Sequence, residues 1–370
     1  MIYVGGVPFS VDSESSSQVL LPMYSLYENL FYEQESDMLF ALMEHPILVS
    51  ASSSLKAIPE WKFTISEESG SERSRQSKCV YIFQGEYATV DPALVDVVGT
   101  DEATTCVGLA IRNRTSGMTS VAHMDSPNIV DVGITQMLTL VVNQNSDAEL
   151  DVFFSISSKF CRVDKLFVFN DLRASDGTRA ERKAKLEGYS FPLCAKIVET
   201  LQKSRGKFHL QTLHVLRHNT RWDSRGNACP IFHGFLVETS TGSVIPASFD
   251  RMSRCPDEIV RRTRITACFE DSHWNGRLLE TYDTQTDRFI IAPCSWTKRQ
   301  LHFALTVQEL PDSEILLSRS TSPFAEGPDF VDTERRKCDY LIRYPDWRHT
   351  FPMKQPRVFV RTVDGIWVRQ

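Results

Sequence analysis

Cys106 and His123 lie 17 positions apart in the first half of the chain. An imidazole beside a thiol can accept the thiol proton and leave a thiolate, the form that attacks a carbonyl carbon. The imidazole also needs a neighbouring group that fixes its orientation. Thr100, Asp101 and Glu102 closely precede the cysteine and can supply that group. These residue types suggest nucleophilic catalysis, provided that the fold brings the cysteine and the histidine together.

A β-hairpin between the two residues decides whether they meet. Residues 105–112 and 119–124 have strand-like patterns, and residues 113–117 form a turn. A hairpin centred between residues 114 and 115 places the two side chains directly opposite, with Cβ atoms about 4.5–5.5 Å apart. A centre between 115 and 116 makes them diagonal neighbours at about 7–8 Å, and a centre on either residue separates them onto opposite faces. A buried thiol and a partly exposed histidine without catalytic function remain the competing interpretation.

The composition is that of an ordinary globular protein. The 370 residues are 42% hydrophobic and 24% charged, with a net charge of −6, which argues against nucleic acid as the main partner. The longest apolar runs fall far short of the roughly 18 residues of a membrane span. No zinc-knuckle cysteine spacing, HExxH, GxGxxG or Walker sequence occurs, so we expect neither a metal nor a nucleotide cofactor. The N-terminus lacks a secretory pattern, so we expect a cytoplasmic or nuclear protein with reduced cysteines.

Short strands alternate with a few helices along the chain, which predicts an α+β or α/β fold rather than a helical bundle. Residues 1–78 are interpreted as an N-terminal helical segment, with helical periodicity over 24–46 that Pro46 ends, and an exposed loop at 66–78. Residues 79–370 follow as a single domain, because no Pro/Gly/Ser-rich linker divides them. Further helices are predicted at 91–98, 126–141, 192–203, 257–263 and 331–344, further strands at 79–83, 209–217, 231–238 and 301–307, and hairpin turns at 239–242, 283–287 and 364–365.

Four motifs resemble those of one enzyme family, the eukaryotic protein N-terminal asparagine amidohydrolases, most closely its plant members. The resemblance runs from about residue 46 to the C-terminus. The motifs are Asp101-Glu102-Ala103-Thr104-Thr105-Cys106 with His123 and Asp125, Pro293-Cys294-Ser295-Trp296, Ser320-Thr321-Ser322-Pro323-Phe324-Ala325-Glu326 with Pro328 and Phe330, and the weaker Ala247-Ser248-Phe249.

The resemblance implies hydrolysis of the side-chain amide of an N-terminal asparagine to aspartate, without a cofactor. The new aspartate would then be arginylated and read by a ubiquitin ligase. Cys106 would be the nucleophile and His123 the base. The spacing also resembles that of the bacterial chemoreceptor glutamine deamidases, which place a hydroxyl residue six positions before the cysteine, here Thr100. That likeness implies an α-β-β layered sandwich of the α+β class, shared distantly with the cytotoxic necrotizing factor toxins.

The implied substrate is a protein or peptide with a free N-terminal asparagine, and the implied downstream partner is an arginyl-transferase. We expect a monomer without nucleic-acid or membrane partners. Backbone N–H groups near Thr105 are candidates for holding the oxyanion. The free α-amino group needs a carboxylate, for which Asp101, Glu102 and Asp125 are candidates. Ser322 and Glu326 are further substrate-binding candidates. Competing interpretations make Asp125 a helix-start residue, Ser322 a turn former and Glu326 a solvated loop charge.

One stretch departs from the family pattern. Where the family has a His-Leu-Val-Gly-Gly-like strand end, this chain reads Val152-Phe153-Phe154-Ser155-Ile156, and no match resumes before about Leu172. An insertion at about 152–172 is therefore expected. Two other functions stay open: a thiol deamidase of internal glutamine or asparagine, and a non-catalytic binder of protein N-termini.

Overall fold

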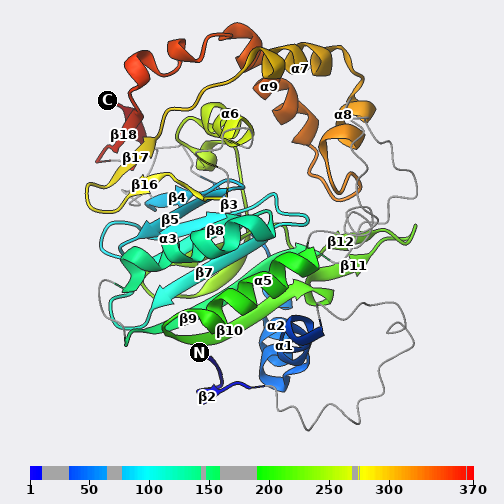
Figure 1. The fold of residues 1–370 in the computed structure, drawn as a ribbon, viewed down its shortest axis with the longest axis vertical. Helices are drawn as coiled ribbons and strands as arrows, with labels where there is room; N and C mark the ends of the chain where they lie inside the picture. Colours follow the sequence, from blue (N-terminus) through cyan, green and yellow to red (C-terminus); the bar gives the residue numbers. More distant parts are fainter. Residues whose placement is uncertain are drawn as a thin grey trace, which may run out of the picture.

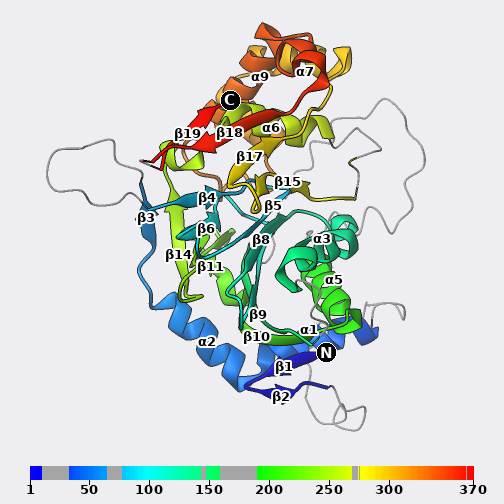
Figure 2. The ribbon, with the colours of Figure 1, turned by 90° about the vertical axis from the view of Figure 1, so that its left-hand side faces the viewer.

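Two stacked β-sheets form the centre of the molecule. The computed structural model describes residues 1–10, 33–64, 77–142, 147–158, 190–268, 274, 276–363 and 365–370. Within this part of the chain, helices cover one face of the larger sheet and the smaller sheet covers the other (Figures 1 and 2). The structure is a mixed one of helices and several sheets, compatible with the expected α+β class.

The larger sheet has eight strands in the order β15-β5-β8-β7-β9-β10-β1-β2. At its centre, β7 (Val107–Asn113) pairs antiparallel with β8 (Thr119–Met124) and with β9 (Glu149–Ser158). Both faces of this hairpin are buried, with Leu109 and Ala122 in the core on one side and Ala110 and Val121 in the core on the other. The other strands are β15 (Leu279–Glu280), β5 (Glu86–Val90), β10 (Lys207–Leu216), β1 (Ile2–Val4) and β2 (Val7–Pro8).

The smaller sheet has five strands in the order β3-β14-β13-β6-β4. Val98 and Phe235 from this sheet pack against Ala110 and Val121 from the larger one, so an apolar core fills the space between the two. The five strands are β3 (Trp61–Phe63), β14 (Val244–Phe249), β13 (Phe235–Glu238), β6 (Val97–Thr100) and β4 (Cys79–Tyr81).

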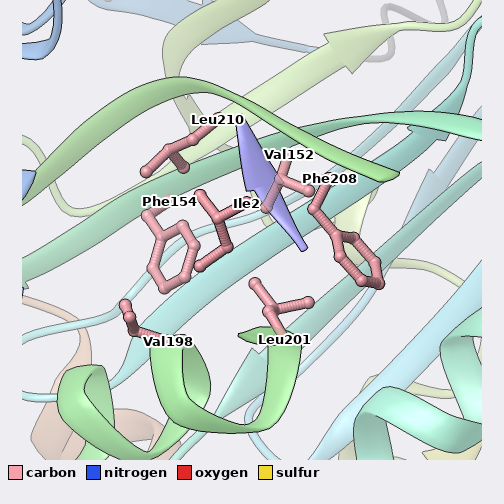
Figure 3. Close-up of a pocket in the computed structure, with 7 residues that line it drawn as sticks. All are labelled: Ile2, Val152, Phe154, Val198, Leu201, Phe208 and Leu210. Carbon is pink, nitrogen blue, oxygen red and sulfur yellow. The ribbon is translucent and has the colours of Figure 1, made fainter. Parts of the chain in front are cut away.

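Helices α3 (Val130–Val142) and α5 (Ser190–Lys203) cover the other face of the larger sheet (Figure 2). Helices α1 (Glu33–Glu44) and α2 (Pro46–Lys56) pack at the end of that layer, against α5 and β10. Figure 3 shows Ile2 of β1 among apolar side chains of β9, β10 and α5. Strands β1 and β3 pair with β10 and β14, so residues 1–78 contribute strands to both sheets.

The C-terminal third adds a group of helices and a four-stranded sheet beyond the two central sheets (Figure 1). No single described helix is long and apolar enough to span a membrane, although Asp37–Glu44 and Pro46–Lys56 meet that test as a pair bent by 64°. The C-terminal elements are α6 (Glu258–Cys268), α7 (Lys298–Glu309), α8 (Asp312–Arg319), α9 (Phe330–Arg343), β16 (Tyr282–Asp283), β17 (Arg288–Ile291), β18 (Arg357–Arg361) and β19 (Trp367–Arg369), and a separate ribbon pairs β11 (Thr220–Trp222) with β12 (Ala228–Pro230).

Two sequence-based expectations were wrong, and one was incomplete. Residues 91–98 form a turn, in which Asp91 accepts from the Ala93 N–H, and then strand β6, because the β-branched valines pair with β13 and β4. Residues 301–307 lie inside helix α7, where Thr297 and Gln300 form a reciprocal capping box. The helix expected before Pro46 does end there, since α1 closes at Glu44, although residues 24–32 lie outside the described residues. Helix α2, which begins at Pro46, was not expected, and proline is well tolerated in a first helical turn.

Most other expected elements are confirmed. They include the strands 105–112 and 119–124, the helix that follows Ser126, the helix at 331–344 and the hairpin turns at 239–242 and 283–287. The expected loop at 66–78 lies outside the described residues except for its last two positions, and so does Asp364 of the last hairpin turn.

Candidate active site

The β7–β8 hairpin adopts the second of the two registers that keep Cys106 and His123 on one face. Gly108 pairs with His123 and Val107 with Met124, so the hairpin is centred between residues 115 and 116. Cys106, just before β7, is therefore a diagonal neighbour of His123 and not directly opposite it. The turn explains this register, because the Asn113 N–H donates to the Met118 carbonyl and Gly117 takes a positive φ of 75°.

His123 lies between the two sheets. It projects from β8 toward β6, where the Thr100 Oγ1 is 2.7 Å from the His123 Nδ1. The opposite ring atom, Nε2, is buried and has no hydrogen-bond partner among the described residues. Gly108 leaves room beside the imidazole for Phe235, whose ring would lie 2.3 Å from a Cβ at that position. One ring nitrogen is thus held by a hydroxyl, and the other is left to act as a base.

Burial makes the neutral forms of the two groups the resting ones. It raises the pKa of the Cys106 thiol well above its usual value, and the nearby carboxylates of Asp125 and Glu326 raise it further. Burial also lowers the pKa of His123 to about 4, although the negative charges of Glu102 and Glu86 oppose the shift. At neutral pH the pair is therefore a thiol beside a neutral imidazole. A thiolate then has to form as the proton is transferred during attack, which is general-base catalysis.

Two of the candidate carboxylates are occupied by structural partners. Asp101, 3% exposed, accepts from the Tyr81 hydroxyl at 2.7 Å and the Phe249 N–H at 2.7 Å, and contacts the Arg254 Nη2 at 3.1 Å. Glu102 contacts Arg254 at 2.6 Å and Arg262 at 2.8 Å. These arginines oppose both negative charges, although burial and the neighbouring Glu102 still raise the pKa of Asp101 to about 6. Of the three carboxylates, one or more of which is expected to bind the substrate ammonium, Asp101 and Glu102 therefore already have basic partners.

Asp125 and Glu326 have different surroundings, since neither forms an ion pair with a basic side chain in the described part of the chain. Asp125 accepts from the Gln84 amide at 3.0 Å, and Glu326 accepts from the Ser320 hydroxyl. Burial raises the pKa of both, to about 7 for Glu326, where Glu102, Glu334 and Asp329 add to the shift. The hairpin register, continued by one position beyond the Val107–Met124 pair, places Asp125 opposite Cys106, and both carboxylates raise the pKa of the Cys106 thiol.

The third motif comes close to the nucleophile loop although the two lie more than 200 positions apart. The Thr105 Oγ1 is 3.2 Å from the Thr321 Oγ1, and the Thr105 carbonyl accepts from Ser190 at the start of α5. Next to this contact, Ser322 is 1% exposed, and its hydroxyl has no hydrogen-bond partner among the described residues. Buried hydroxyls are normally paired, so this one is available to a ligand.

The other motifs have structural contacts. Phe249, in the fourth motif, donates its N–H to Asp101, and Trp296 is buried with its Nε1 donating to the Tyr344 carbonyl at 3.0 Å. Of the unmatched stretch, Val152 to Ser158 belong to strand β9, where Ser155 pairs with Gly108 and the pairing with β10 shifts register between Ser155 and Ser158. Residues 159–172 lie outside the described residues. No group of three or more His, Cys, Asp or Glu side chains in the described ranges is arranged to hold a metal ion.

Sequence analysis did not single out Arg254 and Arg262. They follow Asp101 and Glu102 by more than 150 positions, and in sequence they belong to an ordinary charged run around α6. The useful signal was the pair of adjacent acidic residues just before the nucleophile. Buried acidic residues require basic partners, but several basic runs, among them 179–185, 251–264 and 335–343, could supply them, so the sequence alone did not select Arg254 and Arg262.

Comparison with known proteins agrees with the site. A model of the protein N-terminal asparagine amidohydrolase family matches residues 69–369. The chain is 56% identical to the protein N-terminal asparagine amidohydrolase of Arabidopsis thaliana over 367 residues, 99% of each protein. Over 295 and 291 residues it is 28% and 27% identical to the proteins of that name from Mus musculus and Homo sapiens, covering 78% of this chain and 83% of each relative. The chain therefore belongs to the protein N-terminal asparagine amidohydrolase family and is an amidohydrolase.

Proposed function

We propose that this enzyme converts an N-terminal asparagine of a protein or peptide to aspartate through a thioester on Cys106. The observation that carries the proposal is the Thr100–His123 contact of 2.7 Å beside Cys106, with the second imidazole nitrogen unpartnered. This is the arrangement that an orienter, a base and a nucleophile require.

The reaction has two halves. His123 accepts the Cys106 proton at Nε2 while the sulfur attacks the side-chain amide carbon, and backbone N–H groups near Thr105 and Cys106 hold the resulting oxyanion. The C–N bond then breaks, the proton passes from His123 to the departing nitrogen, and ammonia leaves. In the second half, His123 takes a proton from water, the hydroxide attacks the thioester carbon, and the C–S bond breaks. Aspartate is released, and His123 returns its proton to the departing sulfur, which restores the Cys106 thiol.

Recognition of the free amine is assigned to Asp125 and Glu326. An N-terminal asparagine differs from an internal one by its ammonium group, so the enzyme needs a negative charge near the nucleophile. Asp125 and Glu326 both act on the Cys106 thiol and have no basic partner in the described residues, whereas Asp101 and Glu102 are paired with arginines. The hydroxyl of Ser322 is placed to contact the same substrate.

The wider setting is part of the same proposal. The product aspartate would enter the arginylation branch of ubiquitin-dependent degradation, which requires a cytoplasmic or nuclear enzyme, and the protein would act as a monomer. The layering of helices, large sheet and small sheet also supports a fold relationship with the bacterial glutamine deamidases and the necrotizing factor toxins.

The test is ammonia release from an asparagine-starting peptide, with its N-acetylated form for comparison. We expect release from the free peptide alone, and equal rates would favour a deamidase of internal residues. Cys106→Ala should abolish turnover, whereas Cys338→Ala, which removes a buried thiol from α9, should retain it. His123→Ala should lower kcat by about 10²–10⁴ and Thr100→Ala by less, since Thr100 acts through the imidazole. Binding of the peptide without ammonia release would instead favour the non-catalytic binder.

A further inference from the structure

Arg254 connects two segments of the site, the one that leads to Cys106 and the one that follows Glu326. Its side chain is 8% exposed, and the guanidinium contacts three carboxylates, those of Asp101, Glu102 and Asp329. The Nη1 atom lies 2.6 Å from Glu102 and 3.2 Å from Asp329, and the Nη2 atom lies 3.1 Å from Asp101. One rigid cation thus joins chain segments more than 220 positions apart in sequence.

Both connected segments carry site residues. Asp101 and Glu102 directly follow Thr100 and precede Cys106 by a few positions, so fixing them fixes the orienter and the nucleophile. Glu102 has a positive φ of 61°, a strained conformation for this residue, and its two arginine contacts hold it there. At the other end, Asp329 lies three positions after Glu326.

We propose that Arg254 is a positioning residue that sets the separation between the Cys106 sulfur and the Glu326 carboxylate, and through it the preference for asparagine over glutamine. The inference rests on the proposed function. If the substrate ammonium is held at Glu326, that separation must match the distance from the ammonium to the side-chain carbonyl. Glutamine is longer by one carbon–carbon bond, roughly 1.5 Å. A misplacement of about 1 Å costs about 10²-fold in rate, so a fixed separation rejects glutamine.

The Asp329→Asn variant weakens one of the three carboxylate contacts of Arg254 and is the change least expected to disturb the fold. The Asp329 side chain is 47% exposed, so its loss should leave the fold intact. The matched control is Asp332→Asn, since Asp332 is 59% exposed and pairs at 2.6 Å with Arg251, three positions before Arg254. The control removes a similar surface ion pair between the same two segments without touching the Asp101 and Glu102 cluster.

The experiment measures kcat/KM of the full chain on two peptides that differ only in asparagine or glutamine at the first position. We expect Asp329→Asn to lower the asparagine-to-glutamine ratio by up to about fivefold and Asp332→Asn to leave it unchanged. The ratio is the informative quantity, because a general loss of folded enzyme lowers both rates equally and cancels.

Arg254→Lys supplies a stronger variant and an internal check. A lysine keeps the charge but cannot hold three carboxylates in a planar fork, so the ratio should fall by at least about tenfold. In that background Asp329→Asn should have little further effect, since both changes break one connection.

Two results would overturn the inference. One is an unchanged asparagine-to-glutamine ratio in an Arg254→Lys enzyme that is folded and active. The other is an equal ratio in Asp329→Asn and Asp332→Asn. Failure of the proposed function looks different, because the unmodified enzyme would then release no ammonia from the asparagine peptide.

Discussion

Two pairs of carboxylates surround Cys106 and His123, and they differ in what balances their charge. Asp101 and Glu102 contact two arginines, and the Asp101 side chain is almost fully buried. Asp125 and Glu326 are held by an amide and a hydroxyl, without a basic partner in the described residues. The first pair is part of the framework, and the second has negative charge left for a cation. A carboxylate near a nucleophile is therefore a candidate for binding an ammonium only when its charge is not already balanced.

The largest expected effect is on stability, and it separates the two pairs. Arg254→Met leaves the buried Asp101 without its cation, and breaking a buried pair in this way should lower the free energy of unfolding by about 3–5 kcal/mol. Glu326→Gln removes a charge that is unpaired in the free enzyme, so it should change that free energy by less than about 1 kcal/mol. Urea unfolding of both variants measures the difference. Equal losses would mean that the two pairs are equally structural.

The sequence could predict the arrangement of the nucleophile, base and orienting residue much better than the partners of the two neighbouring carboxylates. Cys106, His123 and Thr100 come from two neighbouring strands and the end of a third, so hairpin geometry limited their arrangement to a few registers. The turn at Asn113 and Gly117 then selected one of these. The partners of Asp101 and Glu102 were beyond such reasoning, because Arg254 meets them only through packing of segments far apart in sequence. The helix at 298–309 was missed for a different reason, since its apolar pattern also fits a strand and only the local Thr297–Gln300 capping signal distinguishes the two.

The next effect is catalytic. Glu326→Gln keeps the shape of the side chain and its hydrogen bond with Ser320 but removes the charge. A hydrogen bond to a charged group contributes about 1.5–3 kcal/mol, so kcat/KM for an asparagine-starting peptide should fall by about 10- to 150-fold. Steady-state ammonia release measures it, and Glu314→Gln, which removes the charge of an exposed carboxylate on α8, is the control. Loss of activity in both variants alike would contradict the assignment of the ammonium to Glu326.

A pH profile tests the same carboxylate without a large change in structure. Burial raises the pKa of Glu326 to about 7, so below this pH the group is increasingly protonated and neutral. We expect kcat/KM to rise with pH up to about 7, by up to tenfold per unit. It should fall again above about 8, where the substrate α-amino group loses its proton. His123, with its pKa near 4, titrates too low to produce the rise. Glu326→Gln should remove the rise of kcat/KM below about pH 7. A rise that is unchanged in this variant would mean that another group produces it.

The smallest expected effect concerns the unpartnered hydroxyl of Ser322. Because this buried group has no hydrogen-bond partner among the described residues, Ser322→Ala should leave the thermal midpoint unchanged or slightly raised. If the hydroxyl binds substrate, kcat/KM should still fall by about 2- to 13-fold, the value of a neutral hydrogen bond of about 0.5–1.5 kcal/mol. Ser320→Ala is the comparison, since that hydroxyl donates to Glu326 and accepts from the Ser322 N–H, so its loss should lower both quantities. A Ser322→Ala enzyme with full activity would restrict substrate contact in this loop to the Glu326 carboxylate.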